Sequence, residues 1–405
     1  MTEVSPLPGS VPRSWILYNL FTWALYTLKP VFRFVYMNIR YATYISFALL
    51  TGLGTTRTQA QVTGGTRAFE FLNMSNSPHV SALGGIAPAN PEADVSLALQ
   101  NPSLFRPGIH NQLSVNHNVY YADIGISNLQ YAYHAPKLQT TFGVGIQSVN
   151  YGTFQATDIY GTGLGTVRAN DFALNLSAAR QYKEHWRYGL TLKWAHSTLA
   201  DRSASALLGD VGVTYFDTAN RITLGIVAKN MGVTLKRYNP ANPAEPLPFD
   251  LQIGITKALK NVPLKLFVVA HHLYQWDVRY NNPADKKSNV FGADTVTDSK
   301  NYFGDKLFRH ITLGGELTIG KRLGITVAYN HLRRNELSTL ENKGLAGFSF
   351  GAGLYLNRFQ VHYARSFMAT AGAYNEFGLN IALDKLFKVG DKTDSWHWNN
   401  DYPNW

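Results

Sequence analysis

Apolar residues alternate with small or polar residues in about fourteen short segments between positions 113 and 383. In one of these segments, Phe142, Val144 and Ile146 are separated by two glycines. A spacing of two residues is typical of a β-strand that has one apolar face. The chain is therefore expected to form a succession of strands, each with one face in an apolar environment.

The apolar residues mark expected strands at positions 113–121, 129–133, 142–146, 172–176, 188–194, 211–215, 222–226, 249–255, 264–268, 311–319, 323–329, 348–356, 359–363 and 377–383. The opposite face is mainly Gly, Ala, Ser, Thr and Asn, with isolated charges at Lys193, Lys229, Asp250, Glu316 and Glu376. A soluble β-sandwich would carry many charges on its solvent face, whereas a small or polar face suits the lumen of a membrane barrel.

The connections between these strands alternate in length. Short connections fall at 182–185, 217–220, 258–262, 320–322 and 357, and long ones at 152–169, 232–247, 275–307 and 333–345. Outer-membrane barrels with both termini in the periplasm have short turns on that side and long loops outside. The pattern predicts an all-β, 14-stranded antiparallel transmembrane β-barrel over residues 111–384 in the outer membrane, followed by a polar periplasmic tail at 385–405.

Residues 61–110 do not alternate. Phe69, Leu72 and Met74 fit one side of a short helix, and Asp94 is placed to cap another. The segment has too few apolar residues for a core of its own. We therefore expect a helical or irregular N-terminal plug inside the barrel or across its mouth.

An export signal precedes the plug. Residues 38–40 form a short basic region, residues 41–53 an apolar region, and residues 58–60 a small-x-small cleavage site. Cleavage is predicted between Ala60 and Gln61.

Residues 1–36 do not fit this signal, so translation is expected to start at Met37. The alternative is a helical membrane anchor made of residues 16–28 and the apolar region, although Lys29, Pro30 and Arg33 interrupt that run.

Composition agrees with a membrane barrel. Charged residues make up 16% of the chain and cysteine is absent, whereas soluble domains carry about 25% charge. Beyond residue 60, 32 basic and 25 acidic residues remain, a net charge of +7. A basic barrel could favour anionic lipopolysaccharide, but a solvated mixed surface is the simpler explanation of the charge. No basic run with interleaved aromatic residues indicates nucleic-acid binding.

Candidate catalytic and metal sites are weak in the sequence. The glycines at 161–165 lack the lysine and the strand-to-helix context of a phosphate loop. His271 and His272 are possible metal ligands, but neighbouring residues of one strand face opposite sides. His117 and His362 have serines nearby in sequence, as a lipid-face hydrolase would need. We therefore predict no enzymatic role, no cofactor and no metal.

Several stretches resemble known outer-membrane proteins. They are Phe69–Leu72, Ser81–Gly85, Asp94, Asn101–Pro102, His110–Ser114, Gln147–Gly152, Asn170–Ser177, Pro246–Phe249 and Ala270–Asp277. The first four resemble the start of FadL-like proteins. Taken in order, the set is similar to the PorQ family of the Bacteroidetes type IX secretion system.

This resemblance implies a fourteen-stranded barrel that anchors the cell-surface attachment complex and holds an extracellular PorZ-like partner. The alternative is a FadL-like transporter of hydrophobic compounds, which needs a gap in the barrel wall and a movable hatch. A third class is a barrel enzyme with a Ser–His contact on the lipid face. For the anchor, the expected docking loop is 275–307, with Trp276, Tyr280, Tyr302 and Phe303 as aromatic contacts.

Overall fold

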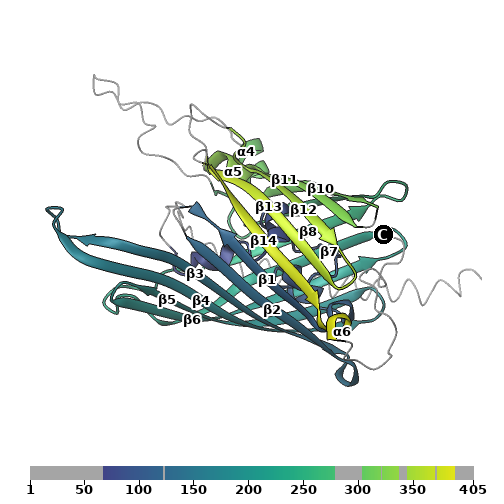
Figure 1. Cartoon of the computed structure of the whole chain (residues 1–405), viewed down its shortest axis with the longest axis horizontal. Helices are drawn as coiled ribbons and strands as arrows, with labels where there is room; N and C mark the ends of the chain where they lie inside the picture. The colour runs from purple at the N-terminus through teal and green to yellow at the C-terminus, as the bar shows by residue number, and fades with distance from the viewer. Residues whose placement is uncertain are drawn as a thin grey trace, which may run out of the picture. The chain divides into compact units, whose positions relative to one another are not determined.

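The computed structural model describes residues 67–121, 124–278, 303–320, 322–336, 344–369 and 372–387. Fourteen strands form a closed antiparallel barrel in which each strand pairs with the next, and β1 closes the circle against β14 (Figure 1). The predicted fold class is confirmed. Met37, the Ala60–Gln61 junction, Tyr280, Tyr302 and the tail beyond residue 387 lie outside the described residues.

The strands are β1 (Gln112–Val119), β2 (Gly125–Ala135), β3 (Thr140–Thr157), β4 (Gly163–Tyr182), β5 (Trp186–Leu199), β6 (Arg202–Asp217), β7 (Ile222–Lys236), β8 (Asp250–Ala258), β9 (Leu264–Ala270), β10 (Ile311–Ile319), β11 (Leu323–Asn330), β12 (Phe348–Tyr355), β13 (Phe359–Ala369) and β14 (Gly372–Ala382). Each contains or overlaps one of the segments that the alternation predicted. A period of two was therefore sufficient to find every strand.

The alternation separates the two faces of the wall as predicted. In β5, Leu192 is 53% exposed on the outer face, whereas its neighbour Thr191 is 4% exposed on the lumenal face. Leu379 of β14 also points outward. An apolar outer face on a closed barrel is the arrangement that lipid requires, because closure gives every strand a paired neighbour on both sides.

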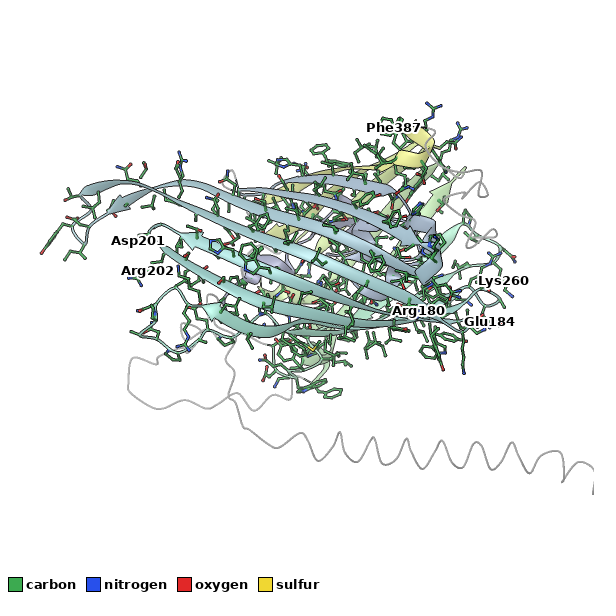
Figure 2. The ribbon with its side chains drawn as sticks, turned by 90° about the horizontal axis from the view of Figure 1, so that it is seen from below. Arg180, Glu184, Asp201, Arg202, Lys260 and Phe387 are labelled. Atoms are coloured by element: carbon green, nitrogen blue, oxygen red, sulfur yellow. The ribbon has the colours of Figure 1, made fainter. Side chains whose placement is uncertain are left out.

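The two ends of the barrel differ. Figure 2 shows Arg180, Glu184, Lys260 and Phe387 at one end, and Asp201 and Arg202 at the other. The first end carries the short turns. At the second end β3 and β4, of 18 and 20 residues, rise as a long hairpin (Figure 1). Residues 152–169 were expected to be a loop, but most of them continue these two strands.

The plug consists of short elements, which are η1 (Glu70–Asn73), α2 (Pro78–Ala82), α3 (Val95–Ala98), η2 (Pro102–Leu104) and η3 (Pro107–Ile109). They pack against the inner wall: α2 contacts β12, β13 and β14, and η2 contacts β4, β5 and β6. The segment 67–110 thus occupies the lumen.

Glycines of the wall let the plug backbone approach closely. A Cβ atom on Gly189 of β5 would lie 2.5 Å from the carbonyl carbon of Pro102, and one on Gly225 of β7 would overlap the carbonyl oxygen of Pro88. These lumenal glycines therefore make room for the plug.

Three further helices lie at the strand ends, namely α4 (Phe303–Arg309), α5 (His331–Glu336) and α6 (Leu383–Phe387), and η5 (Pro136–Leu138) forms a turn. In the described part of the chain, no helix is long and apolar enough to cross a membrane.

Candidate functional site

A cluster of ionisable side chains joins the plug to the wall in the lumen. Its members are His79, Glu92 and Asp94 of the plug, Lys265 of β9, Glu316 of β10, Tyr355 of β12 and His362 of β13. Of these, Asp94 was expected as a cap, Glu316 as an isolated lumenal charge and His362 as a possible catalytic histidine.

His79 is the centre of this cluster. Its Nδ1 atom lies 2.9 Å from Asp94 Oδ2. Asp94 caps α3, as predicted, by accepting a hydrogen bond of 2.8 Å from the backbone N–H of Ser96. The cap therefore fixes Asp94, and Asp94 in turn orients the imidazole of His79.

The other ring nitrogen of His79 faces two carboxylates. His79 Nε2 lies 3.4 Å from Glu92 Oε2 and 3.7 Å from Glu316 Oε2. Within the described residues it makes no hydrogen bond, and neither does Glu316 Oε2. The His79 side chain is only 3% exposed, so its second nitrogen is buried with two carboxylates at ion-pair distance and no hydrogen bond among the described residues.

Both carboxylates also have partners on the wall. Lys265 Nζ forms an ion pair with Glu92 Oε1 and lies 3.7 Å from Glu316 Oε1. The hydroxyl of Tyr355 lies 3.2 Å from Glu92 Oε2 and 3.3 Å from Glu316 Oε1.

The field inside the cluster is strongly negative. Burial alone would lower the pKa of His79, but the hydrogen bond to Asp94 and the charges of Glu316 and Glu92 outweigh burial and raise that pKa well above its usual value. For Glu92, burial raises the pKa, but Lys265 and His79 outweigh burial and bring it to about 2. This plug residue is therefore ionised at neutral pH.

A second, apolar region lines the lumen. Phe69, Phe71 and Leu72 of the plug pack there against inward-facing wall residues. The wall contributes Ile126, Val149, Ala173, Ala195, Ala204, Ala206 and Leu208. Burying one such plug side chain stabilises the closed arrangement by about 1.5–3 kcal/mol.

The wall is interrupted beside this region. β7 extends to Lys236, but its pairing with β8 stops at Lys229 and Asp250. Asn230 has a left-handed φ of 59°, and its backbone N–H donates a hydrogen bond of 2.8 Å to Asp210 at a register shift between β6 and β7. Residues 230–236 therefore have no partner strand on the β8 side among the described residues.

The segment from residue 237 to residue 249, which includes four prolines, follows this interruption. The backbone N–H of Ala68 in the plug donates a hydrogen bond of 3.1 Å to the carbonyl of Pro246. A small pocket opens between the plug and this segment, lined by Ala68, Phe69, Ala204, Thr234, Tyr238 and Glu245 among others.

The outer connections carry exposed apolar groups. At the tip of the β3–β4 hairpin, Ile159 and Tyr160 are 90% and 86% exposed. At the base of the long connection 275–307, the ring of Trp276 stacks on His310 at 5.6 Å and contacts Phe303. The glycines at 161–165 lie in the turn and the first residues of β4, and not in a phosphate loop.

His271 and His272 differ from expectation. They were expected to face opposite sides of a strand, but β9 ends at Ala270 and His272 adopts a φ of 56°. Their Nδ1 atoms consequently lie 2.6 Å apart. Within the described residues they belong to no group of three potential metal ligands.

The two histidines with serines nearby lie on opposite faces. His362 is buried in the lumen and stacks on His79 at 4.9 Å. His117 is on the outer face, where its Nδ1 lies 3.0 Å from Ser127 Oγ. This is a Ser–His contact on the lipid face, but the described residues give His117 no second hydrogen bond to orient it, as a catalytic relay requires.

The closed barrel, its apolar outer face and its lumenal plug define an integral outer-membrane β-barrel. No protein-family model matches the chain, and no curated protein matches its sequence.

Solved structures with a similar fold include a deltaS2 mutant of the TodX monoaromatic hydrocarbon channel. The two sequences are 10% identical, the alignment covers 76% of this chain and 97% of the TodX chain, and the TM-score is 0.47. The CymD monoaromatic hydrocarbon channel has 12% identity, coverages of 76% and 96%, and a TM-score of 0.46. A Pseudomonas aeruginosa FadL homologue has 10% identity, coverages of 75% and 97%, and a TM-score of 0.41. The likeness concerns the barrel and does not extend to what each channel conducts.

Proposed function

We propose that this protein is an outer-membrane channel for small hydrophobic compounds and that the N-terminal plug is its gate. The proposal rests on three structural features that lie next to one another, where η1 of the plug faces the wall. These are the interruption between β7 and β8, the pocket at Ala68 and Phe69, and the apolar lining under η1.

An apolar solute would enter at the pocket and displace Phe69, Phe71 and Leu72 from their contacts with the wall. The solute would then replace the apolar surface that these side chains cover. Moving these side chains away from the wall costs about 1.5–3 kcal/mol of burial free energy for each side chain. The incoming solute offsets part of that cost because it covers the same apolar surface. The plug thus has a region that can open without unfolding of the barrel.

The test is uptake of a monoaromatic hydrocarbon into proteoliposomes. Thr234 lines the pocket, whereas the next residue of β7, Leu235, is 59% exposed on the other face. Thr234→Trp is expected to reduce uptake several-fold because the indole fills the pocket. Leu235→Trp adds a ring of the same size outside and should leave uptake unchanged. Equal uptake by the two variants would contradict the proposal.

A second candidate is the structural anchor of a type IX secretion attachment complex, as the resemblance to the PorQ family implies. The exposed tip of the β3–β4 hairpin favours it, because Ile159 and Tyr160 form an apolar contact surface beyond the membrane. The partner would be a PorZ-like surface protein.

For this candidate, the hairpin and the long connection are the surfaces to shorten. Deleting residues 281–299, or residues 158–162, should release the surface partner and send secreted cargo into the medium. Retention of the partner by both shortened barrels would exclude these surfaces. Release of the partner with unchanged hydrocarbon uptake would favour the anchor over the channel.

A further inference from the structure

We propose that His79, Glu92 and Glu316 bind one divalent transition-metal ion between the plug and the wall, and that zinc suits this ligand set best. His79 and Glu92 come from the plug, and Glu316 comes from β10. The proposal does not depend on the function of the barrel.

The spacing of the donor atoms fits a metal better than hydrogen bonds. Zinc binds nitrogen and carboxylate oxygen at about 2.0–2.2 Å, so the ligands of a tetrahedral ion lie about 3.3–3.6 Å apart. His79 Nε2 lies 3.4 Å from Glu92 Oε2 and 3.7 Å from Glu316 Oε2. One ligand atom from each of the three residues lies within 4.8 Å of the others.

The unpartnered nitrogen is the second, independent observation. His79 Nε2 is buried and makes no hydrogen bond with any described residue, and Glu316 Oε2 is in the same state. Buried polar atoms without a hydrogen bond destabilise the folded state. A metal ion between the two atoms would give each of them a partner.

The surroundings orient these ligands as metal sites require. Asp94 accepts a hydrogen bond from His79 Nδ1, which leaves the lone pair of Nε2 aimed at the two carboxylates. A carboxylate behind the histidine is the usual outer partner of a zinc ligand. Lys265 pairs with the other oxygen of each carboxylate, Oε1. The hydroxyl of Tyr355 donates to Glu316 Oε1 and also to the ligand oxygen Glu92 Oε2.

Charge balance points the same way. Glu92, Asp94 and Glu316 bring three negative charges, and Lys265 brings one positive charge. These four groups carry a net charge of −2, which one divalent cation bound in place of the second proton of His79 balances. Buried charge without compensation is strongly destabilising.

His362 provides a matched control. Its ring stacks on His79, and it forms a second possible group with His79 and Asp94. That group would need an oxygen of Asp94, but Oδ2 lies 2.9 Å from His79 Nδ1 and Oδ1 accepts hydrogen bonds from Ser96. His362 is therefore expected not to be a ligand, although it is as buried as His79.

The experiment measures zinc in the purified full chain after equilibration with buffered zinc and removal of free ion. Wild type and His362→Gln should retain about one zinc per chain, whereas His79→Gln and Glu316→Gln should lose at least nine-tenths of it. Heat-modifiable migration on gels shows which variants are folded. A wild type that retains no zinc, or a folded His79→Gln that retains it fully, would overturn the proposal.

X-ray absorption at the zinc edge tests the same claim on the wild type alone, in case a variant does not fold. The expected signal is a first shell of nitrogen and oxygen at about 2.0–2.2 Å that includes one imidazole. A shell without imidazole would overturn the assignment of His79.

Discussion

At the scale of single residues, the face on which a side chain lies determines which solvent it meets. Leu192 lies near the middle of β5 and faces lipid, whereas Leu199 ends the same strand at the outer rim. Both side chains are more than half exposed on the outer surface of the barrel. A difference in stability between substitutions at the two positions therefore cannot come from packing inside the barrel.

Leu192→Arg is therefore expected to lower the free energy of unfolding by about 2–4 kcal/mol, because it places a charge near the bilayer midplane. Leu199→Arg should cost only about 0–1 kcal/mol, as substitutions near the interface do. Refolding into vesicles with a denaturant titration measures both values. Equal costs would show that Leu192 is not deep in the membrane.

Single glycines of the wall are needed for the plug. Gly225→Ala should destabilise the protein by about 1–3 kcal/mol, the usual cost of overpacking, because its Cβ meets the backbone of Pro88. Gly125→Ala is the control, since its Cβ would lie at an ordinary 3.6 Å from the His117 ring. Thermal unfolding of the two variants makes the comparison. If Gly225→Ala is as stable as the control, the plug does not touch the wall there.

At the scale of elements, the alternation predicted every strand but underestimated β3 and β4. Near Phe142 one face of β3 meets lipid and the other meets the plug, so apolar and small residues alternate. Around Phe154, Gln155 and Thr157 both faces are exposed, and the alternation disappears while the backbone pairing continues. The alternation arises because the two faces of a strand lie in different environments. It therefore disappears where both faces meet water.

The cluster of charged residues around His79 could not be predicted from the alternation of residues along the chain. Glu316 on its strand was visible as an isolated lumenal charge, and Asp94 as a cap. Their meeting at His79 depends on where the plug sits inside a closed circle of strands, which no local pattern encodes. Sequence separations above 200 residues, as between His79 and Glu316, are set by the tertiary fold alone.

The β3–β4 hairpin should be dispensable for folding. Its last paired residues inside the regular ladder are Asn150 and Asn170, and beyond them most side chains are exposed. Replacing residues 152–168 by a short turn is expected to change the unfolding free energy by less than about 1 kcal/mol, because little apolar surface is buried there. Heat-modifiable migration and denaturant unfolding would measure this, and loss of the folded barrel would contradict it.

At the scale of the whole molecule, two parts of the plug make different kinds of contact with the wall. The charged cluster ties residues 79–94 to β9 and β10, whereas η1 contacts the wall mainly through apolar side chains. Apolar contacts are not directional and exchange readily for an apolar solute. Gating is therefore expected at η1, with the cluster as the fixed point.

The most direct measurement is hydrocarbon uptake by a barrel whose gate is tied shut. The chain has no cysteine, so Arg67→Cys with Tyr274→Cys gives a unique thiol pair. The ends of the two native side chains meet at 2.6 Å, and the linker replaces the length that the shorter cysteines lack. After closure with a short bis-maleimide, uptake into proteoliposomes should fall to the level of vesicles without protein, while each single-cysteine variant treated alike remains active. Undiminished uptake by the cross-linked barrel would contradict a gate at the plug.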